Sequence, residues 1–181
     1  MRVFHSISTM HYMKRILMAV LAIMLTSCAS TDSGESKFSS QDIMFAEMMI
    51  PHHEQAIEMS DLALATSQDP EVLALATQIK NAQAPEIDQM KSWGGSHMDS
   101  HASHMMDGML SEEAINELKS ARGVEFDRLF LEGMIRHHEG AIDMANDVDD
   151  SKNPDVAKLA QSILITQRAE IELMKELLQR L

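Results

Sequence analysis

Two stretches of this sequence repeat each other along their whole length, and the repeat restricts what the chain can fold into. Residues 45–59 have the sequence FAEMMIPHHEQAIEM, and residues 130–144 have the sequence FLEGMIRHHEGAIDM. After a one-residue shift, Asp69-Pro70 matches Asn153-Pro154 in the same way. Internal similarity of this kind is the signature of one structural unit used twice. We therefore expect two copies of one unit, joined by the residues between them.

Each copy has the pattern of a helix–turn–helix unit. In the first copy, apolar residues such as Phe45, Met49 and Ala56 recur at helical spacing. The Asp-Pro and Asn-Pro pairs are strong helix starts, because the first side chain caps the helix and Pro suits its first position. No segment alternates with a period of two, so we predict no sheet. The predicted helices cover residues 40–66, 70–93, 124–148 and 154–181.

The connection between the copies, residues 94–123, is long and contains its own helix signals. Ser111 is a suitable cap for a short extra helix, which we expect to end at about Arg122-Gly123. Four helices with two short turns and one long middle crossover predict an all-α four-helix bundle. The bundle domain would cover residues 40–181, as tandem helix–turn–helix repeats over residues 40–93 and 124–181.

The first 27 residues have the layout of a secretory signal peptide. Their apolar run, residues 16–25, is too short to span a membrane. Leu25-Thr-Ser-Cys28 resembles the lipobox of bacterial lipoproteins, which implies cleavage before Cys28 and lipid attachment there. Residues 28–39 would then be the lipidated Cys and a polar tether. The alternative is an ordinary signal peptide followed by an unrelated Cys.

The lipobox resemblance implies a lipid-anchored protein of the cell envelope, on the periplasmic side. Ala29 is not the Asp that is associated with inner-membrane retention in enterobacterial-type lipoproteins, so the outer membrane is favoured where one exists. The formal net charge of −13 and the lack of a basic patch argue against a nucleic-acid partner.

The paired histidines of the repeat fall on the helix faces that must point into the bundle. At about 100° per residue, His52 and His53 share an apolar arc with Met49 and Met59. The second copy repeats this arrangement, and the second helix of each copy adds a Gln/Glu/Met set. Neutral imidazole and thioether are good Cu(I) ligands, and bundle interiors are common places for metal sites. The candidate interior ligands are Met49, His52, His53, Met59 and Met90, with Met134, His137, His138, Met144 and Met174 in the second copy.

The competing interpretation of these faces is structural. A His on an apolar face is usually a core residue that is bonded to a neighbour, and Glu86 or Gln83 could satisfy it. A Met at helical spacing usually fills a core. The residues by themselves leave both interpretations open.

The middle connection contains a second, denser set of soft ligands. Residues 97–109 hold three His and four Met but no Lys or Arg, and these Met residues follow no apolar period. Thioethers favour Cu(I), and Ag(I) is expected to behave similarly. The alternative is a merely polar linker. The candidate ligands are His97, Met98, His101, His104, Met105, Met106 and Met109.

An enzymatic di-iron centre does not fit the motif. A ferritin-type centre needs Glu-x-x-His on two helices. Here Glu47 precedes His52 by five positions, and Glu132 precedes His137 by five. We find no nucleophile–base set and no phosphate loop, so we do not expect an enzyme.

The two His-His motifs, together with Gln-x-x-Glu-Ile-x-x-Met in both copies, resemble the domain-of-unknown-function family numbered 305, over roughly residues 40–181. That resemblance implies a ferritin-like helical fold, export, and in some members copper binding and copper tolerance. It implies here a lipoprotein that binds Cu(I) or Ag(I) through the candidate residues named above and buffers it or hands it on. Copper-export or copper-chaperone proteins are then candidate partners.

Arg136 stands where the first copy has Pro51, so the two sites would differ. The alternatives are a non-metal structural or interaction bundle and, more distantly, a ferritin-like redox enzyme.

Overall fold

The computed structural model describes residues 37–94 and 106–181, and this part of the chain is helical and without strands. Its elements are α2 (Ser40–Thr66), α3 (Pro70–Lys91), α4 (Glu112–Ser120), α5 (Gly123–Asn146) and α6 (Pro154–Leu178). The expectation of an all-α fold is confirmed. The proposed signal peptide, Cys28 and residues 97–105 lie outside the described residues. Within those residues, no helix combines the length and the apolar character that a membrane crossing requires.

Helices α2, α3 and α6 begin at side-chain caps, whereas the side chain of Arg122 before α5 makes no cap hydrogen bond. Ser39 and Asp42 form a reciprocal capping box at the start of α2. The side chains of Asp69 and Asn153 accept hydrogen bonds from the first backbone amides of α3 and α6. Helix α3 ends slightly earlier than predicted, at Lys91, and the chain turns at Gly94 with a φ of 78°.

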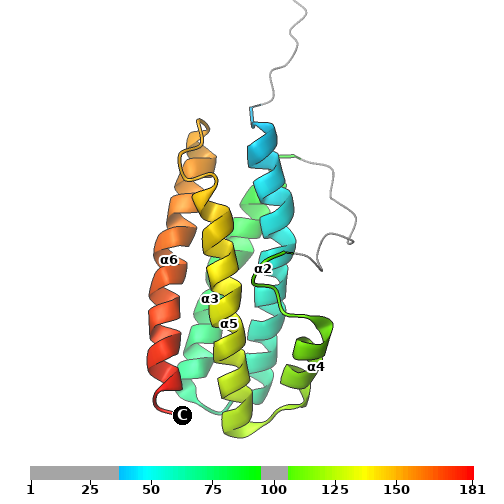
Figure 1. Ribbon diagram of the computed structural model, residues 1–181, viewed down its shortest axis with the longest axis vertical. Helices are drawn as coiled ribbons and strands as arrows, with labels where there is room; N and C mark the ends of the chain where they lie inside the picture. The colour runs from blue at the N-terminus through cyan, green and yellow to red at the C-terminus, as the bar shows by residue number, and fades with distance from the viewer. Residues whose placement is uncertain (1–36, 95–105) are drawn as a thin grey trace, which may run out of the picture. The chain divides into compact units, whose positions relative to one another are not determined.

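The four long helices lie side by side, with α4 on the outside against α5 (Figure 1). Helix α2 packs mainly on α3 and α5 mainly on α6, as two antiparallel pairs. The contact of α2 with α5 joins the two copies and is much more extensive than that of α3 with α6. Because α2 and α5 carry the repeated His-His motif, this packing brings the two motifs to the same interface.

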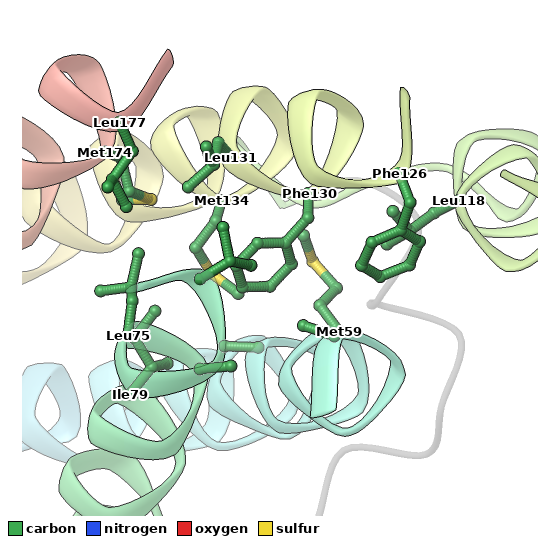
Figure 2. Packing of buried hydrophobic residues seen from close by; sticks show 14 of the residues in the cluster. Met59, Leu75, Ile79, Leu118, Phe126, Phe130, Leu131, Met134, Met174 and Leu177 are labelled. Atoms are coloured by element: carbon green, nitrogen blue, oxygen red, sulfur yellow. The ribbon is translucent and has the colours of Figure 1, made fainter. Parts of the chain in front are cut away.

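The apolar core is divided into two clusters at opposite ends of the bundle. One cluster is built around Phe126 and Phe130, and Figure 2 shows Met59 reaching toward them from α2. The other contains Phe38 stacked on Trp93, with ring centroids 5.3 Å apart. Residues from the middle of each long helix lie between the two clusters, and these residues are polar.

The end of the middle crossover is fixed to both copies at one level of the bundle. The Gln55 amide donates to the Leu110 carbonyl at 3.0 Å and accepts from the Leu110 amide at 2.8 Å. Gly140 occupies the corresponding position in the second copy, and its missing side chain lets the backbone of Asp107 and Gly108 approach α5 closely. The crossover therefore lies on the α2–α5 interface.

Replacing Gly140 by Ala should destabilise the fold, although Gly to Ala inside a helix normally stabilises by about 0.5–1 kcal/mol. The new Cβ would overlap the backbone of Asp107, which cannot rotate away. We expect a loss of about 1–3 kcal/mol, typical of overpacking, measured by urea unfolding.

Gly133→Ala is the matched control in the same helix. Its Cβ would meet only side-chain ends, Leu110 Cδ2 at 3.1 Å and Met59 Cε at 3.3 Å, which can move. A Gly140→Ala protein that is as stable as Gly133→Ala would contradict the close approach of the crossover.

Candidate functional site

A layer of polar side chains crosses the bundle between the two apolar clusters. Each copy contributes two His, one Gln and one Glu, and all four imidazoles are fully buried. The expectation that the His pairs face the interior is confirmed. We call this set the histidine layer. Its members are His52, His53, Gln83 and Glu86 from the first copy, and His137, His138, Gln167 and Glu170 from the second.

One His in each copy is paired with a carboxylate from the next helix. His53 Nε2 lies 2.9 Å from Glu86 Oε2, and His138 Nε2 lies 2.8 Å from Glu170 Oε2. An ionised carboxylate only accepts hydrogen bonds, so Nε2 carries the proton in each pair. In the neutral ring, Nδ1 then has a free lone pair. Neither Nδ1 atom has a hydrogen-bond partner among the described residues.

The two pairs are not equally shielded. The Glu86 side chain is 16% exposed, whereas that of Glu170 is 2% exposed. Glu170 also accepts a hydrogen bond from Gln78 on the neighbouring α3, at 2.9 Å. Burial lowers the pKa of His138 and outweighs the opposing effect of Glu170. The second copy therefore holds the more deeply buried pair.

The other two histidines meet each other across the copies. The His52 and His137 ring centroids are 3.8 Å apart, with the rings tilted by 41°. His137 Nε2 donates to the His52 carbonyl at 2.9 Å, which leaves His137 Nδ1 with its lone pair. Within the described part of the chain, neither nitrogen of His52 makes a hydrogen bond of normal geometry.

Both rings of this contact are strongly biased toward the neutral form. Loss of hydration lowers the pKa of His52 to about 3, and the nearby His53 adds to the shift. The backbone of Asp107, from the end of the crossover, favours the charged form but does not outweigh the burial. Burial also lowers the pKa of His137 well below its ordinary value, reinforced by the neighbouring His52 and His138.

The layer contains further buried polar atoms that the described residues do not satisfy. Among the described residues, the amide nitrogen and oxygen of both Gln83 and Gln167 lack hydrogen-bond partners. Such atoms are rare in proteins, and each costs about 1–3 kcal/mol. Together with the free imidazole nitrogens, they fit a layer that takes up water or a cation.

The chemistry of the donors fits a soft cation better than a hard one. The part of the chain that the structure describes has no cluster of three or more His, Cys, Asp and Glu suited to a metal ion. A carboxylate behind an imidazole is the usual support for a metal-binding His, because it fixes the tautomer and orients the ring. The remaining donors would have to be thioethers.

Five of the six predicted Met residues are buried on either side of the layer. Met49 and Met90 belong to the cluster around Trp93, and Met59, Met134 and Met174 belong to the cluster around Phe130. All five are at most 1% exposed. The cluster around Phe130 therefore contains buried thioethers from both copies, whereas those of the cluster around Trp93, Met49 and Met90, come from the first copy.

Met144 departs from the expectation of an interior position. It is only partly buried and lines a pocket on the surface. The reason lies in the helix opposite. Met59 packs beside Gly133, which has no side chain, but the residue that corresponds to Gly133 in the first copy is Met48, so Met144 has no glycine opposite it.

The candidates in the middle connection are only partly described. Met106 and Met109 are partly buried where the crossover docks on the α2–α5 interface. The remaining candidates, His97, Met98, His101, His104 and Met105, lie outside the described residues.

The sequence did not reveal that His52 and His137 would touch. The available signal was the repeat itself, because an interface between equivalent helices brings equivalent residues together. The role of Glu170 could have been inferred from its match to Glu86.

The sequence matches the model of a family described as "Domain of unknown function (DUF305)" over residues 42–178. No curated protein matches it. A DUF305 fragment from Deinococcus radiodurans is similar in structure, with a TM-score of 0.70 and 36% identity over 79% of this chain and 98% of that one. A DUF305 protein from Streptomyces coelicolor that is described as secreted has a TM-score of 0.73 and 30% identity over 78% and 93%.

The structure of CopM in its Cu(II)-bound form is also similar, with a TM-score of 0.67 and 35% identity over 77% of this chain and 96% of CopM. CopM has also been solved in Cu(I)-bound and Ag-bound forms, with TM-scores of 0.66 and 0.61. These relatives are metal-binding proteins or proteins of unknown function rather than known enzymes.

Acidification should destabilise this protein through three of its buried imidazoles, those of His52, His137 and His138. Their folded-state pKa values lie below the value of about 6.5 for an exposed His, so below that pH the unfolded chain binds more protons. Stability is therefore fully present above pH 6.5 and falls as the pH drops toward 3. Each imidazole that stays neutral contributes a slope of about 1.4 kcal/mol per pH unit in this window.

Urea unfolding at pH 7.5, 6.5 and 5.5 measures this slope. A His52→Gln/His137→Gln protein should have a shallower slope below pH 6.5, because two of the neutral imidazoles are gone. Equal stability of the unsubstituted protein at pH 7.5 and 5.5 would show that the rings are not buried in neutral form.

Proposed function

Because this chain belongs to the DUF305 family, we propose that it is an exported protein that binds Cu(I), and also Ag(I), to buffer the metal or hand it on. The observation that carries the proposal is the pair of buried imidazoles, His53 and His138, each held by a carboxylate and each with a free Nδ1. The similarity to CopM, which binds copper and silver, supports it. The metal is cargo in this proposal.

The proposed interior ligands are His and Met residues of the layer and its two borders. Glu86 and Glu170 hold the His53 and His138 rings in the tautomer that directs a lone pair away from the carboxylate. The buried Met residues supply soft, uncharged donors, so a Cu(I) ion adds only one positive charge to the interior. The proposed set comprises Met49, His52, His53, Met59 and Met90, with Met134, His137, His138 and Met174.

The His/Met-rich segment is the second proposed ligand set. Its described end docks beside His52, on the α2–α5 interface, through Gln55 and Gly140. We propose that a metal captured by residues 97–109 is passed on to the histidine layer. Capture by the segment and storage in the layer are compatible roles of one protein.

The N-terminal residues determine the proposed location of the protein in the cell. We propose that residues 1–27 direct export, that Cys28 is lipidated, and that residues 28–39 tether the bundle to the membrane. Ala29 after the Cys favours an outer-membrane position on the periplasmic side, where the cell has an outer membrane, and the family resemblance makes copper-export or copper-chaperone proteins the proposed partners. We also interpret the bundle, residues 40–181, as ferritin-like.

A structural role for the layer is the second candidate. The bond from His137 to the His52 carbonyl ties the two copies together without a metal. In that case the buried histidines would fix the α2–α5 interface, and the protein would be a helical interaction module of the envelope.

An anaerobic Cu(I) competition titration on residues 29–181 tests the proposal. In the layer variant, His53→Gln and His138→Gln keep an amide that can donate to Glu86 and Glu170 but remove the ring nitrogen that would bind metal. In the segment variant, six ligands are changed to Ser: His97, Met98, His101, His104, Met105 and Met106. The variant that removes the tighter site should bind Cu(I) at least about tenfold more weakly, which corresponds to a loss of about 1.4 kcal/mol of binding free energy.

Cu(I) should also raise the thermal unfolding midpoint, because it binds the folded chain in preference to the unfolded one. The layer variant should lose most of this increase if the metal is stored in the interior. No binding by the unsubstituted protein, with an unchanged midpoint, would leave the structural role as the better explanation.

A further inference from the structure

A pocket of about 290 Å³ lies on the surface between the first half of α2 and the end of α5. Three of the side chains that line it are methionines, which we call the surface methionines: Met44, Met48 and Met144. Met44 is 58% exposed, and the other two are partly buried. Their thioethers are therefore accessible from solvent, unlike those beside the histidine layer.

The helix geometry places these side chains together. Met44 and Met48 are four residues apart and occupy one face of α2, about one turn from each other. Met144 comes from α5, which packs along α2. At the rim, the Gln41 amide donates to the Asp147 carbonyl at 2.7 Å and ties the start of α2 to the end of α5.

The repeat provides an internal comparison for this pocket. The positions equivalent to the surface methionines are Leu129, Gly133 and Met59 in the other half of the bundle. There, Met59 is fully buried, and Leu110 packs close to Gly133. On α5, where Leu110 of the crossover covers the site, the two equivalent positions are Leu129 and Gly133. On α2, at the open pocket, both of these positions are methionines. Burial of apolar surface does not account for that difference, because leucine would serve equally well.

We propose that the surface methionines form an accessible binding site for a soft monovalent cation, Cu(I) or Ag(I), separate from the histidine layer. Three uncharged thioethers suit such a cation and offer little to Mg²⁺ or Ca²⁺. Asp147 is one of the residues that line the pocket, and the acidic chain attracts cations in general. The proposal rests on the proposed soft-metal function and adds to it a place where metal enters from solvent.

Methyl-¹³C NMR of methionine-labelled full-length protein during an Ag(I) titration tests this site. Ag(I) is the probe because it keeps its oxidation state during the measurement. We expect the Met44, Met48 and Met144 methyl signals to shift together and to saturate. A Met44→Leu/Met48→Leu/Met144→Leu protein should bind one Ag(I) fewer per chain, with unchanged thermal unfolding in the absence of metal.

An added methionine is the control for non-specific binding to exposed thioethers. Leu173 on α6 is 37% exposed, and Leu173→Met creates a partly exposed thioether that does not belong to the pocket of the surface methionines. Its methyl signal should not shift at Ag(I) concentrations that saturate the surface methionines. An equal shift of the methyl signal at position 173 would overturn the proposal, because it would show that Ag(I) binds any exposed thioether.

The outcomes separate this site from the proposed function. Shifts confined to other methionines, with full Ag(I) binding by the triple-leucine protein, would overturn the surface site and leave the proposed function standing. No shift at any methionine and no bound Ag(I) would overturn both. Shifts of the surface methionines that persist in the layer variant would establish the site as independent of the histidine layer.

Discussion

Burial of neutral imidazoles at the contact of α2 with α5 is the constraint on which the rest of this bundle depends. The His52 and His137 rings lie 3.8 Å apart at the centre of the interface, so charging either would place a cation in an apolar interior next to its neighbour. The outer histidines are held by Glu86 and Glu170 from the flanking helices. The layer thereby links all four long helices and sets their relative height.

The same layer explains the division of the core. Residues before and after it are apolar and build a cluster at each end, while the middle of each helix has to accommodate polar atoms. An uninterrupted apolar core would avoid the unsatisfied amides of Gln83 and Gln167 and would be more stable. Their presence at matched positions in both copies supports a role in holding water or metal rather than a role in stability alone.

The two copies have diverged at the positions where the crossover packs on the α2–α5 interface. Gln55 of α2 makes two hydrogen bonds to the backbone of Leu110, and Gly140 of α5 leaves room for the preceding residues of the crossover. Gly133 likewise makes space for Met59, whereas Met48, at the equivalent position in the first copy, lines the surface pocket together with Met144. The half of the bundle around Phe130 therefore buries its thioethers, whereas the half around Trp93 buries Met49 and Met90 but also has Met44, Met48 and Met144 at a surface pocket.

The sequence by itself determined the helices and their interior faces. Helix starts depend on local caps such as Ser39 and Asp69, and burial of the His pairs follows from their angular position beside Met49 and Phe45. Local signals do not contain the distance between elements that are far apart in the chain. The contact of His52 with His137, the docking of the crossover at Gly140 and the outward position of Met144 were decided only by tertiary packing. Each depends on a residue of another element: His137 of α5 for His52, the missing Cβ of Gly140 for the crossover, and Met48 in place of a glycine for Met144.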